Sequence, residues 1–540
     1  MKRTSIILIV LVQIALTTLI VCLKHPPFFL MDDGYIYANY VSNAGLGHFF
    51  EYNLGEKSGG ITSPLWYFMW TALFSCFRSV LSVKDALHVS GFVLSALFLQ
   101  ATALVIFLFA RQVYKSRWVA SCAGLFVVCD WYLQWGALSG LEIPLTVFVM
   151  SASLWAAWNL DVSDACTLEQ NHYAICSRRA LIVLSFFAYW SRPELIVWML
   201  AIICFFVVRQ VFSRDLMRDY RTPLFMFVAL MLGAMAAGAL YQSMTGRILP
   251  SSFYAKVNVG LNISSLLGNI NKFLHDLTFS EAITLAAFGW ACIWRWSRGD
   301  RLRMWLLPLF AVGAFLISKL ATLPWLGQEH RYISPLRPVM FLFAICPFLL
   351  FFRMSLNHDV DVDMYRSRKP LFISRFAPLM AISILMIFGY SEYLLNVSRP
   401  TFWYWLNCRK EGDVSVGLWL RDHIPTNAIV ASEPIGSIHL FSERFTIDVV
   451  GLTSNDFLGL YPAWDRIMPM LRKRKADYIV YYPKWFQRNG VNPLPVWLER
   501  VASFQVGDGS VEPIGIGSWP IEIYHLNWAL YADLSANKGG

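Results

Sequence analysis

Long apolar runs separated by short polar loops fill the first 390 residues of the chain. Twelve runs stand out, near residues 5–23, 63–81, 88–110, 118–137, 141–158, 179–191, 193–208, 222–241, 280–296, 303–323, 337–352 and 371–390. A run of about 20 apolar residues is long enough to cross the hydrocarbon core of a bilayer as a helix. The pattern therefore predicts a polytopic α-helical membrane module over residues 1–390.

Basic loops between the runs predict how this module is oriented. Short loops rich in Lys and Arg favour the cytoplasmic side. Five occur: "RQVYKSR" (111–117), "CSRR" (176–179), "RQVFSRDLMRDYR" (209–221), "RWSRGDRLR" (295–303) and "RSRK" (366–369). We expect the N-terminal "MKR" to be cytoplasmic too. Three runs precede the first basic loop, so this loop is cytoplasmic only if one of the three does not cross the membrane. The weakest is 63–81, which begins Ser-Pro and contains Arg78. We expect it to lie in the interface or re-enter, leaving about eleven spans.

The chain after residue 391 shows a different pattern, which predicts a small α/β domain outside the membrane over residues 391–540. "DVSVGLWLRDHIP" (413–425) is typical of an amphipathic helix with Asp413 as its N-cap and Pro425 as its stop. Four short segments read as strands: "NAIVASE", "RFTIDVV", "KADYIVYYP" and "PIEIYHL". The same topology places the loop 24–87 outside, so most of the unusual polar residues collect on one face.

Composition agrees with a membrane protein and excludes some functions. The chain is 57% hydrophobic and 15% charged, with a mean hydropathy of +0.49. The net charge of +10 is explained by orienting loops, so we expect no nucleic-acid partner. The cysteines show no C-x-x-C pair and no metal spacing.

Two adjacent carboxylates, Asp32 and Asp33, follow the first apolar run in "MDDGYIYANY". Charges at the hydrocarbon edge are costly unless they have a partner or a task. Three interpretations are open. One carboxylate acts as a general base while the other stays ionised; the pair binds a divalent cation such as Mg or Mn, with Glu142 as a further ligand; or one merely caps the helix that follows.

The surrounding motifs resemble a known family. "DDGYIYANYVSNAGLGHFFEYNLGE" (32–56) followed by "GITSPLW" (60–66) resembles the first outer loop of bacterial C-type glycosyltransferases, in particular the terminal arabinofuranosyltransferases of the mycobacterial cell wall. Further pieces match in the same order: "SGLEIPL" (139–145), "SRPEL" (191–195), "ILPSSFYAKV" (248–257), "HRYISPLRP" (330–338), "IGSIHLFSERFTIDVVGLT" (435–453) and "KADYIVYYPKW" (475–485). One departure is "SGGITSPLW", where Gly59 and Ile61 replace the Glu and Tyr of the family pattern.

The resemblance implies a transferase in the bacterial inner membrane that moves a sugar from a polyprenyl-phosphate donor to a glycan, lipid or protein acceptor on the outer face. It implies that Asp32 or Asp33 takes the proton of the acceptor hydroxyl and that the anomeric centre is inverted. Cationic side chains would hold the leaving phosphate, and the matching residues are Arg331, His330, Lys256 and Arg192. Supporting roles fall to Glu142, Glu194, Tyr35, Asn53, Glu56, Thr62 and Ser63.

Several of these residues also have a purely structural interpretation. In that interpretation, Arg331 is a side chain that extends to the membrane interface, and Arg192 and Glu194 pair only with each other. Glu142 serves as a helix-start charge, and Asp448 fixes a turn. Two other functions are open for the whole chain: a transporter or flippase of a lipid-linked glycan, and a non-catalytic assembly or receptor protein.

Overall fold

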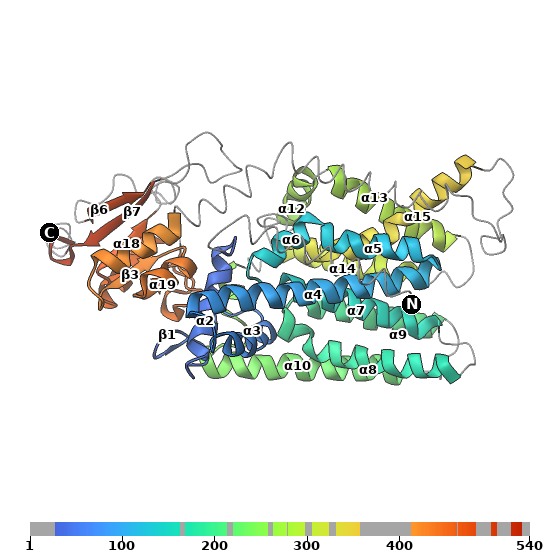
Figure 1. Ribbon diagram of the computed structural model, residues 1–540, viewed down its shortest axis with the longest axis horizontal. Coiled ribbons are helices and arrows are strands. Elements are labelled where there is room, and N and C mark those ends of the chain that lie inside the picture. Colours follow the sequence, from blue (N-terminus) through green and yellow to red (C-terminus); the bar gives the residue numbers. More distant parts are fainter. Residues whose placement is uncertain are drawn as a thin grey trace.

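The computed structural model describes residues 28–162, 168–212, 220–256, 263–277, 279–297, 305–322, 331–356, 412–461, 463–481, 498–504 and 520–531. A helical module occupies most of the length of the molecule, and a smaller domain containing a sheet lies at one end (Figure 1). The predicted runs 5–23 and 371–390, and His330, lie outside the described residues, as does the predicted domain boundary at 390.

Helices from Val83 onward form the module, and most of the longer ones run along the long axis of the molecule (Figure 1). Their bounds are α4 (Val83–Tyr114), α5 (Arg117–Cys129), α6 (Trp131–Leu138), α7 (Ile143–Val162), α8 (Leu168–Ser191), α9 (Leu195–Phe212), α10 (Arg221–Thr245), α11 (Ser251–Lys256), α12 (Ile263–Asp276), α13 (Phe279–Ser297), α14 (Leu306–Thr322), the 3-10 helix η3 (Ser334–Leu336) and α15 (Arg337–Leu356).

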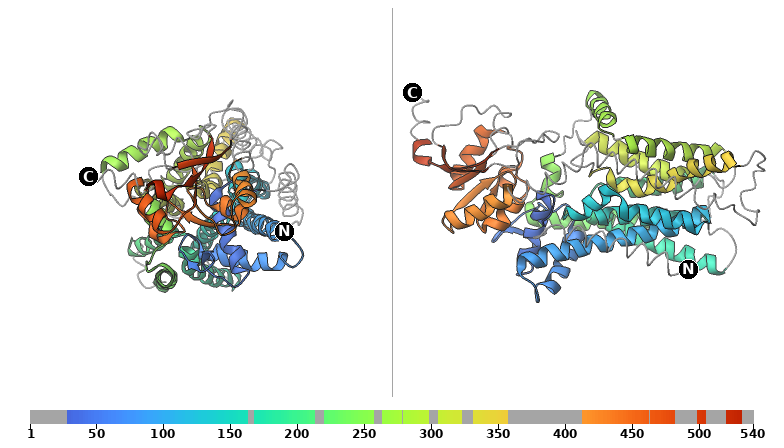
Figure 2. Two further views of the ribbon diagram at one scale, coloured as in Figure 1. Left: turned by 90° about the vertical axis from the view of Figure 1, so that its left-hand side faces the viewer. Right: turned by 45° about the horizontal axis from the view of Figure 1, so that its top comes forward.

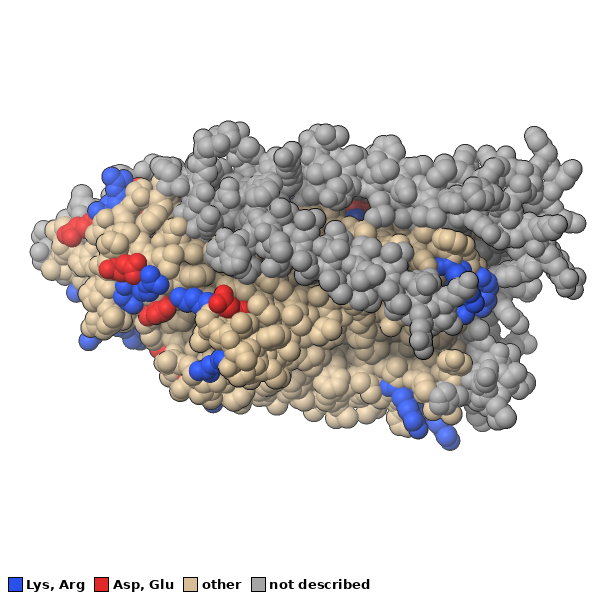
Figure 3. Space-filling model, viewed as in Figure 1, with Lys and Arg blue, Asp and Glu red and all other residues tan. Residues whose placement is uncertain are grey.

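The module has the composition of a membrane protein. Among the described residues, three helical segments are long and apolar enough to cross a bilayer: Val83–Tyr114, Ile143–Leu160 and Arg221–Thr245. Five shorter apolar segments accompany them, at Arg117–Cys129, Leu195–Val211, Glu281–Trp294, Leu306–Ala321 and Ser334–Cys346. The middle of the described surface of the bundle carries almost no charge in the view of Figure 3. Lys and Arg appear toward both ends, and Asp and Glu mainly toward the end with the C-terminal domain. The count of eleven spans stays a prediction.

Two of the predicted runs take a different form in the structure. The run 118–137 is not one helix, because Asp130 interrupts it between α5 and α6 and accepts a hydrogen bond from Leu133 N at 3.1 Å as the N-cap of α6. The run 63–81 contains only the 14-residue helix α3 (Pro64–Phe77). At 1.5 Å per residue this helix is about 21 Å long, which is shorter than the roughly 30 Å hydrocarbon core, in line with a segment that does not cross.

The C-terminal domain, residues 412–531, is built on a five-stranded sheet with the order β4-β3-β5-β7-β6. The strands β3 (Ile429–Ser432), β4 (Phe445–Asp448) and β5 (Tyr478–Tyr481) are parallel, while β7 (Ile521–Leu526) and β6 (Leu498–Phe504) continue the sheet antiparallel. Helices α18 (Ser415–His423) and α19 (Gly436–Ser442) contribute to the apolar core on one face, and α20 (Trp464–Lys473) to the core on the other. The predicted α/β character is thus present.

Local predictions in this domain succeed and fail for physical reasons. All four predicted strands occur, but β6 was not predicted, because its burial is irregular and most of its side chains are exposed or half-buried. Asp413 is not the N-cap of α18. That position belongs to Val414, and Asp413 is buried in the turn before it.

The segment that precedes α4, residues 28–82, is called the first loop here and lies between the helical module and the C-terminal domain (Figures 1 and 2). It contains α2 (Asp32–Ala44), the paired short strands β1 (Glu51–Asn53) and β2 (Glu56–Lys57), and α3. Several of its aromatic side chains are fully buried, among them Tyr35, Tyr40, Tyr52, Trp66 and Trp70. They share one apolar core with the module, and Ile435 and Phe441 of the C-terminal domain belong to the same core. This packing holds α2 rigidly beside the cavity described next.

Candidate active site

A cavity of about 400 Å³ lies where the module, the first loop and the C-terminal domain meet. Its walls are largely apolar, with charged groups on one part of the lining. The charged lining residues are Asp33, Glu142, Arg192, Glu194, Lys319 and Arg331, and Leu452 reaches the cavity from the C-terminal domain. A concave, mostly apolar pocket with a few convergent polar groups is the usual form of a small-molecule site.

Asp33 and Arg331 form the first charged pair. Arg331 Nη1 donates to Asp33 Oδ2 at 2.9 Å, and Nη2 donates to the hydroxyl of Tyr332 at 3.2 Å. The Arg331 side chain is 8% exposed and the Asp33 side chain is 30% exposed. Tyr332 and Asp33 together raise the pKa of Arg331 despite its burial. The guanidinium is therefore a fixed positive charge, and Asp33 is the member of the pair that remains open to the cavity.

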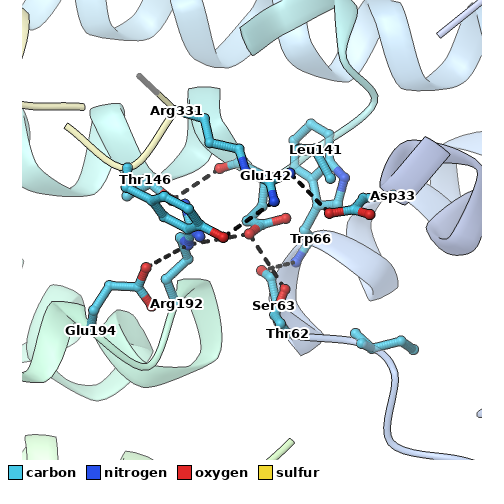
Figure 4. A network of polar contacts seen from close by, with 12 residues as sticks. Asp33, Thr62, Ser63, Trp66, Leu141, Glu142, Thr146, Arg192, Glu194 and Arg331 are labelled. Carbon is cyan, nitrogen blue, oxygen red and sulfur yellow. Dashed lines mark hydrogen bonds and ion pairs between the residues drawn. The ribbon is translucent and has the colours of Figure 1, made fainter. Parts of the chain in front are cut away.

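A second charged cluster lies deeper and joins three elements. Arg192 Nε lies 3.2 Å from Glu142 Oε1 and 3.0 Å from Glu194 Oε1, and Lys319 Nζ of α14 donates to Glu194 Oε1 at 2.6 Å. Burial alone would raise the pKa of Glu194, but Arg192 and Lys319 lower it to about 2. The carboxylates and cations face one another across the short turns between helices (Figure 4).

The two clusters share one aromatic ring. The charged groups of Arg331, Lys319 and Arg192 lie 5.0, 5.0 and 5.7 Å from the ring centroid of Tyr332. Such distances allow cation–π attraction. Three cations are thus gathered around one ring at the cavity wall.

Some bonding capacity in these clusters is unused. Among the residues that the structure describes, neither Glu142 Oε2 nor Arg331 Nε has a hydrogen-bond partner, although both are buried. Arg192 Nε lies between two carboxylates and is aligned with neither as a hydrogen bond. A buried polar group without a partner costs free energy, so the arrangement is that of a site prepared for a polar ligand.

The Thr-Ser motif fixes the first loop against Glu142. Tyr37 OH accepts from Thr62 N at 3.2 Å and from Ser63 N at 2.8 Å, and lies 2.7 Å from Thr62 Oγ1. Thr62 Oγ1 in turn donates to Glu142 Oε1 at 3.4 Å. Ser63 is the N-cap of α3 and accepts from Trp66 N at 3.2 Å. Thr62 therefore lines the cavity, while Ser63 starts a helix beside it.

Asp32 does not face the cavity. Its carboxylate accepts hydrogen bonds from Gly436 N, Ser437 N and Ser437 Oγ at 2.9, 2.9 and 2.7 Å. The interpretation that one of the two carboxylates merely caps the following helix is wrong, because the N-cap of α2 is Met31 and the helix start has no side-chain cap.

The residues present do not fit the suggested metal site. The carboxylate of Asp32 is held by the C-terminal domain, away from Glu142. No group of three or more His, Cys, Asp or Glu side chains that could hold an ion occurs in the described part of the chain.

The remaining predicted site residues lie elsewhere. Tyr35 is buried under α2, where its hydroxyl accepts from Phe29 N at 3.2 Å. Asn53 binds the backbone of Thr446, and Glu56 pairs with Arg474 at 2.6 Å, so both hold the C-terminal domain rather than line the cavity. The backbone of Lys256 ends α11, while its side chain and His330 lie outside the described residues.

Sequence reasoning missed Lys319, Tyr332 and Tyr37. A detectable signal existed for Lys319, because it is the one Lys or Arg of the apolar run 303–323 that follows Arg303 at its start, and an ionisable residue inside an apolar run is a functional candidate. The two tyrosines stand inside the motifs "DDGYIYANY" and "HRYISPLRP", but their residue type alone indicates no role.

Asp448 has the structural role expected of it. It is fully buried at the end of β4, and its carboxylate accepts from Val450 N at 2.9 Å and Thr453 N at 2.8 Å. Burial raises its pKa to about 6. These bonds shape the loop that brings Leu452 to the cavity.

Comparison with known proteins gives the fold but no family for the whole chain. A family model described as a domain of unknown function, DUF8728, matches residues 404–532. No curated protein matches the sequence at a significant level.

Solved structures resemble the whole chain. ArnT from Cupriavidus metallidurans in the apo state has a TM-score of 0.57 at 12% identity, covering 96% of this chain and 97% of that chain. The same protein bound to undecaprenyl phosphate has a TM-score of 0.55 at 12% identity, covering 97% and 98%. An Archaeoglobus fulgidus oligosaccharyltransferase tethered with an acceptor peptide has a TM-score of 0.52 at 12% identity, covering 96% of this chain and 73% of that chain. The chain thus has the C-type glycosyltransferase fold, and its activity has to be argued from the site.

Proposed function

We propose that the chain is a membrane glycosyltransferase that moves a sugar from a polyprenyl-phosphate donor to a hydroxyl of a cell-envelope acceptor. One observation carries the proposal. A partly exposed carboxylate, Asp33, stands 2.9 Å from the buried guanidinium of Arg331, at a cavity that two more cations line. This combination supplies a base for the acceptor and positive charge for a phosphate leaving group.

Asp33 is the proposed general base. As the acceptor oxygen attacks the anomeric carbon, its proton passes to the Asp33 carboxylate, which the hydrogen bond from Arg331 holds in place. A positioned base of this kind contributes about 10²–10⁴-fold in rate. Attack from the face opposite the leaving group inverts the anomeric centre, and the oxocarbenium-like transition state is favoured by a nearby carboxylate.

The cations act on the leaving group, the polyprenyl phosphate. The bond between the anomeric carbon and the phosphate oxygen breaks, and its electron pair stays on the polyprenyl phosphate. Arg331 still has an unused Nε–H donor, and guanidinium groups bind phosphate oxygens well. Arg192 and Lys319 add charge beside it, which favours the transition state in which negative charge develops on the phosphate.

The apolar surroundings suit a lipid-linked donor. The cavity lies at the end of a bundle whose helices have the composition of membrane spans, so a prenyl chain in the bilayer can present its phosphate there. The similar ArnT structure holds undecaprenyl phosphate, and the similar oligosaccharyltransferase carries an acceptor peptide, which supports a lipid donor and a separate acceptor. A pentofuranose sugar, the outer face of a bacterial inner membrane and an extracytoplasmic C-terminal domain are the finer parts of the proposal, taken from the sequence motifs.

A flippase for a lipid-linked glycan is the alternative. Transporters place polar groups on broken helices near the middle of the membrane. The charged cavity of this chain lies at the end of the module that meets the C-terminal domain, and Leu452 of that domain lines it. The distribution of charge therefore favours chemistry at the membrane surface.

Sugar transfer in membranes tests the proposal. Radiolabelled polyprenyl-phosphate sugars would be supplied to wild type, to Asp33→Asn and to Asp422→Asn, a matched control at an exposed carboxylate of the C-terminal domain. We expect transfer by wild type and the control, and a loss of about 10²–10⁴-fold in Asp33→Asn. Normal transfer by Asp33→Asn would refute the assigned base. Translocation of the lipid-linked sugar by wild type without any transfer would favour the flippase.

A further inference from the structure

The two adjacent carboxylates at the start of α2 bind different parts of the molecule. Asp33 pairs with Arg331 at the cavity, whereas Asp32 accepts three hydrogen bonds from Gly436 and Ser437 of the C-terminal domain. These partners lie 404 and 405 positions further along the chain. One residue of α2 therefore faces the reacting groups and the residue before it faces another domain.

We propose that Asp32 is a positioning residue, which fixes the C-terminal domain against the first turn of α2 and so sets where the Asp33 carboxylate stands in the cavity. The inference rests on the proposed function, because it takes Asp33 as the reacting carboxylate. Asp32 is not among the described residues that line the cavity, and its proposed effect on Asp33 is transmitted through α2.

The backbones of the C-terminal domain and α2 are in direct contact at Gly436. A Cβ atom added to Gly436 would lie 2.2 Å from the carbonyl oxygen of Asp32 and 2.9 Å from Ile36 N. Both neighbours are backbone atoms, which cannot turn aside as a flexible side chain does. Only glycine permits this approach, so a small displacement of the C-terminal domain is transmitted directly to the backbone that carries Asp33.

The opposite side of the same turn is equally close to the module. A Cβ atom added to Gly34 would lie 2.2 Å from the carbonyl oxygen of Ser139 and 3.1 Å from the Cα of Gly140. Glu142 follows two residues after Gly140 and carries the unused carboxylate oxygen at the cavity. The first turn of α2 is therefore clamped between the C-terminal domain and the loop that presents Glu142.

Further buried hydrogen bonds hold the same interface. Asn39 Nδ2 donates to Gly436 O at 2.9 Å, and Tyr52 OH donates to Ile435 O at 2.8 Å. Asn53 exchanges two bonds with the backbone of Thr446, at 2.8 and 3.1 Å. These groups are neutral, whereas Asp32 supplies the charged acceptor, and charge-assisted hydrogen bonds are about twice as strong as neutral ones. Asp32 is thus the member of the set whose replacement loosens the contact most.

The expected consequence is a loss of rate rather than of donor binding. The cations that would hold the donor phosphate are carried by α14 and by residues outside α2, and Arg331 contacts α2 through Asp33. A shift of α2 therefore moves the Asp33 carboxylate itself more than it moves these cations. A displacement of a reacting group by about 1 Å can cost roughly a hundredfold in rate. We therefore expect Asp32→Asn to lower kcat about tenfold to a hundredfold while the KM for the donor stays within about twofold.

The test compares Asp32→Asn and Asp33→Asn in the full-length protein by hydrogen exchange and by pH-dependent kinetics. Asp32→Asn should speed amide exchange at Gly436 and Ser437 and keep the acid limb of the rate profile, because Asp33 still provides the base. Asp33→Asn should leave that exchange unchanged and lose transfer. If Asp32→Asn removed the acid limb without changing exchange, Asp32 would be the reacting group and the inference would be wrong. Unchanged exchange together with an unchanged rate would also overturn it.

A milder variant covers the case in which Asp32→Asn fails to fold. Ser437→Ala removes one of the three donors, so it should speed the same exchange and lower kcat by a smaller factor. Unchanged exchange at Gly436 in Ser437→Ala, together with an unchanged kcat, would contradict the inference. If wild type transfers no sugar, the proposed function fails, and exchange still reports separately whether Asp32 holds the domain.

Discussion

Two buried ion networks in this protein contain the same kinds of residue but are completed differently. In the first, at the cavity, Arg331 pairs with Asp33, and Arg192 and Lys319 pair with Glu142 and Glu194. In the second, Arg337 at the start of α15 bonds Asp130 through Nε and Nη2 at 2.9 and 2.7 Å and Glu281 through Nη1 at 3.3 Å. Its guanidinium also lies 4.4 Å from the ring centroid of Tyr132.

The difference lies in unused bonding capacity. Every nitrogen of the Arg337 guanidinium donates to a carboxylate, and the second oxygen of Asp130 accepts from Leu133 N. The cavity network keeps an unpartnered Glu142 Oε2 and Arg331 Nε among the described residues, beside about 400 Å³ of space. A closed network fixes helices, whereas an open one beside a cavity is prepared for a ligand, so each should respond differently to mutation.

Breaking the closed network should cost the most stability. Arg337→Met leaves Asp130 and Glu281, with side chains 2% and 4% exposed, without their cation. Removing one partner of a buried pair typically costs about 3–5 kcal/mol. Denaturant unfolding in detergent would measure this loss. Adding Asp130→Asn and Glu281→Gln to the same protein should restore part of it, and a single variant as stable as wild type would contradict a structural role.

Breaking the open network should cost activity instead. Arg331→Met removes a donor aimed at the leaving phosphate, and losing one such donor typically lowers kcat by about 10²–10³-fold. The stability should change less than in Arg337→Met, because Asp33 is partly exposed and can be solvated. Transfer kinetics and unfolding are measured on the same preparation. A large loss of stability with normal kcat would reverse the assignment of the two networks.

Lys319 should show a smaller effect of the same kind. It touches Glu194 and the ring of Tyr332 rather than Asp33, so Lys319→Met is expected to raise the KM for the donor about tenfold, which corresponds to about 1.4 kcal/mol. Donor titrations at saturating acceptor would measure it. An unchanged KM would remove Lys319 from the phosphate site.

The pH dependence of stability should show the smallest effect. The pKa of Glu194 is about 2 in the folded protein against 4.5 ordinarily, so the folded state binds fewer protons than the unfolded state. Its contribution is therefore present above about pH 4.5 and is lost as the pH falls toward 2. Unfolding midpoints at pH 6 and 3.5 should differ less in Glu194→Gln than in wild type. Equal pH dependence in both proteins would show that Glu194 is not held by its cations.

The sequence predicted those parts that depend on local pattern. Apolar runs located most helices of the module, and short alternating segments located four of the five strands of the C-terminal sheet. The end of α5 and start of α6 at Asp130 were not predicted, because Arg337, the ion-pair partner of Asp130, lies 207 positions away in the sequence. Apolar periodicity cannot report such a distant ion pair. The strand β6 was missed for a different reason: none of its side chains is buried, so its sequence shows no alternation of buried apolar and exposed polar residues.

For the site, motifs located the residue types but not their partners. Asp33, Glu142, Arg192, Glu194 and Arg331 come together as the order of the motifs suggested. The sequence could not predict that Asp32 and Asp33 have different partners. Adjacent residues on a helix face different directions, and the partner of Asp32 is in another domain. Lys319 needed the fold to bring α14 beside Glu194.

Binding of undecaprenyl phosphate to the purified protein tests the central claim most directly, since it needs neither the sugar nor the acceptor. Affinities would be compared for undecaprenyl phosphate and for undecaprenol, in wild type, Arg331→Met and the exposed control Arg421→Met. We expect wild type and the control to bind the phosphate clearly more tightly than the alcohol, and Arg331→Met to lose most of this difference. Equal affinity for both lipids, or full phosphate preference in Arg331→Met, would contradict the claim that the open network is a lipid-phosphate site.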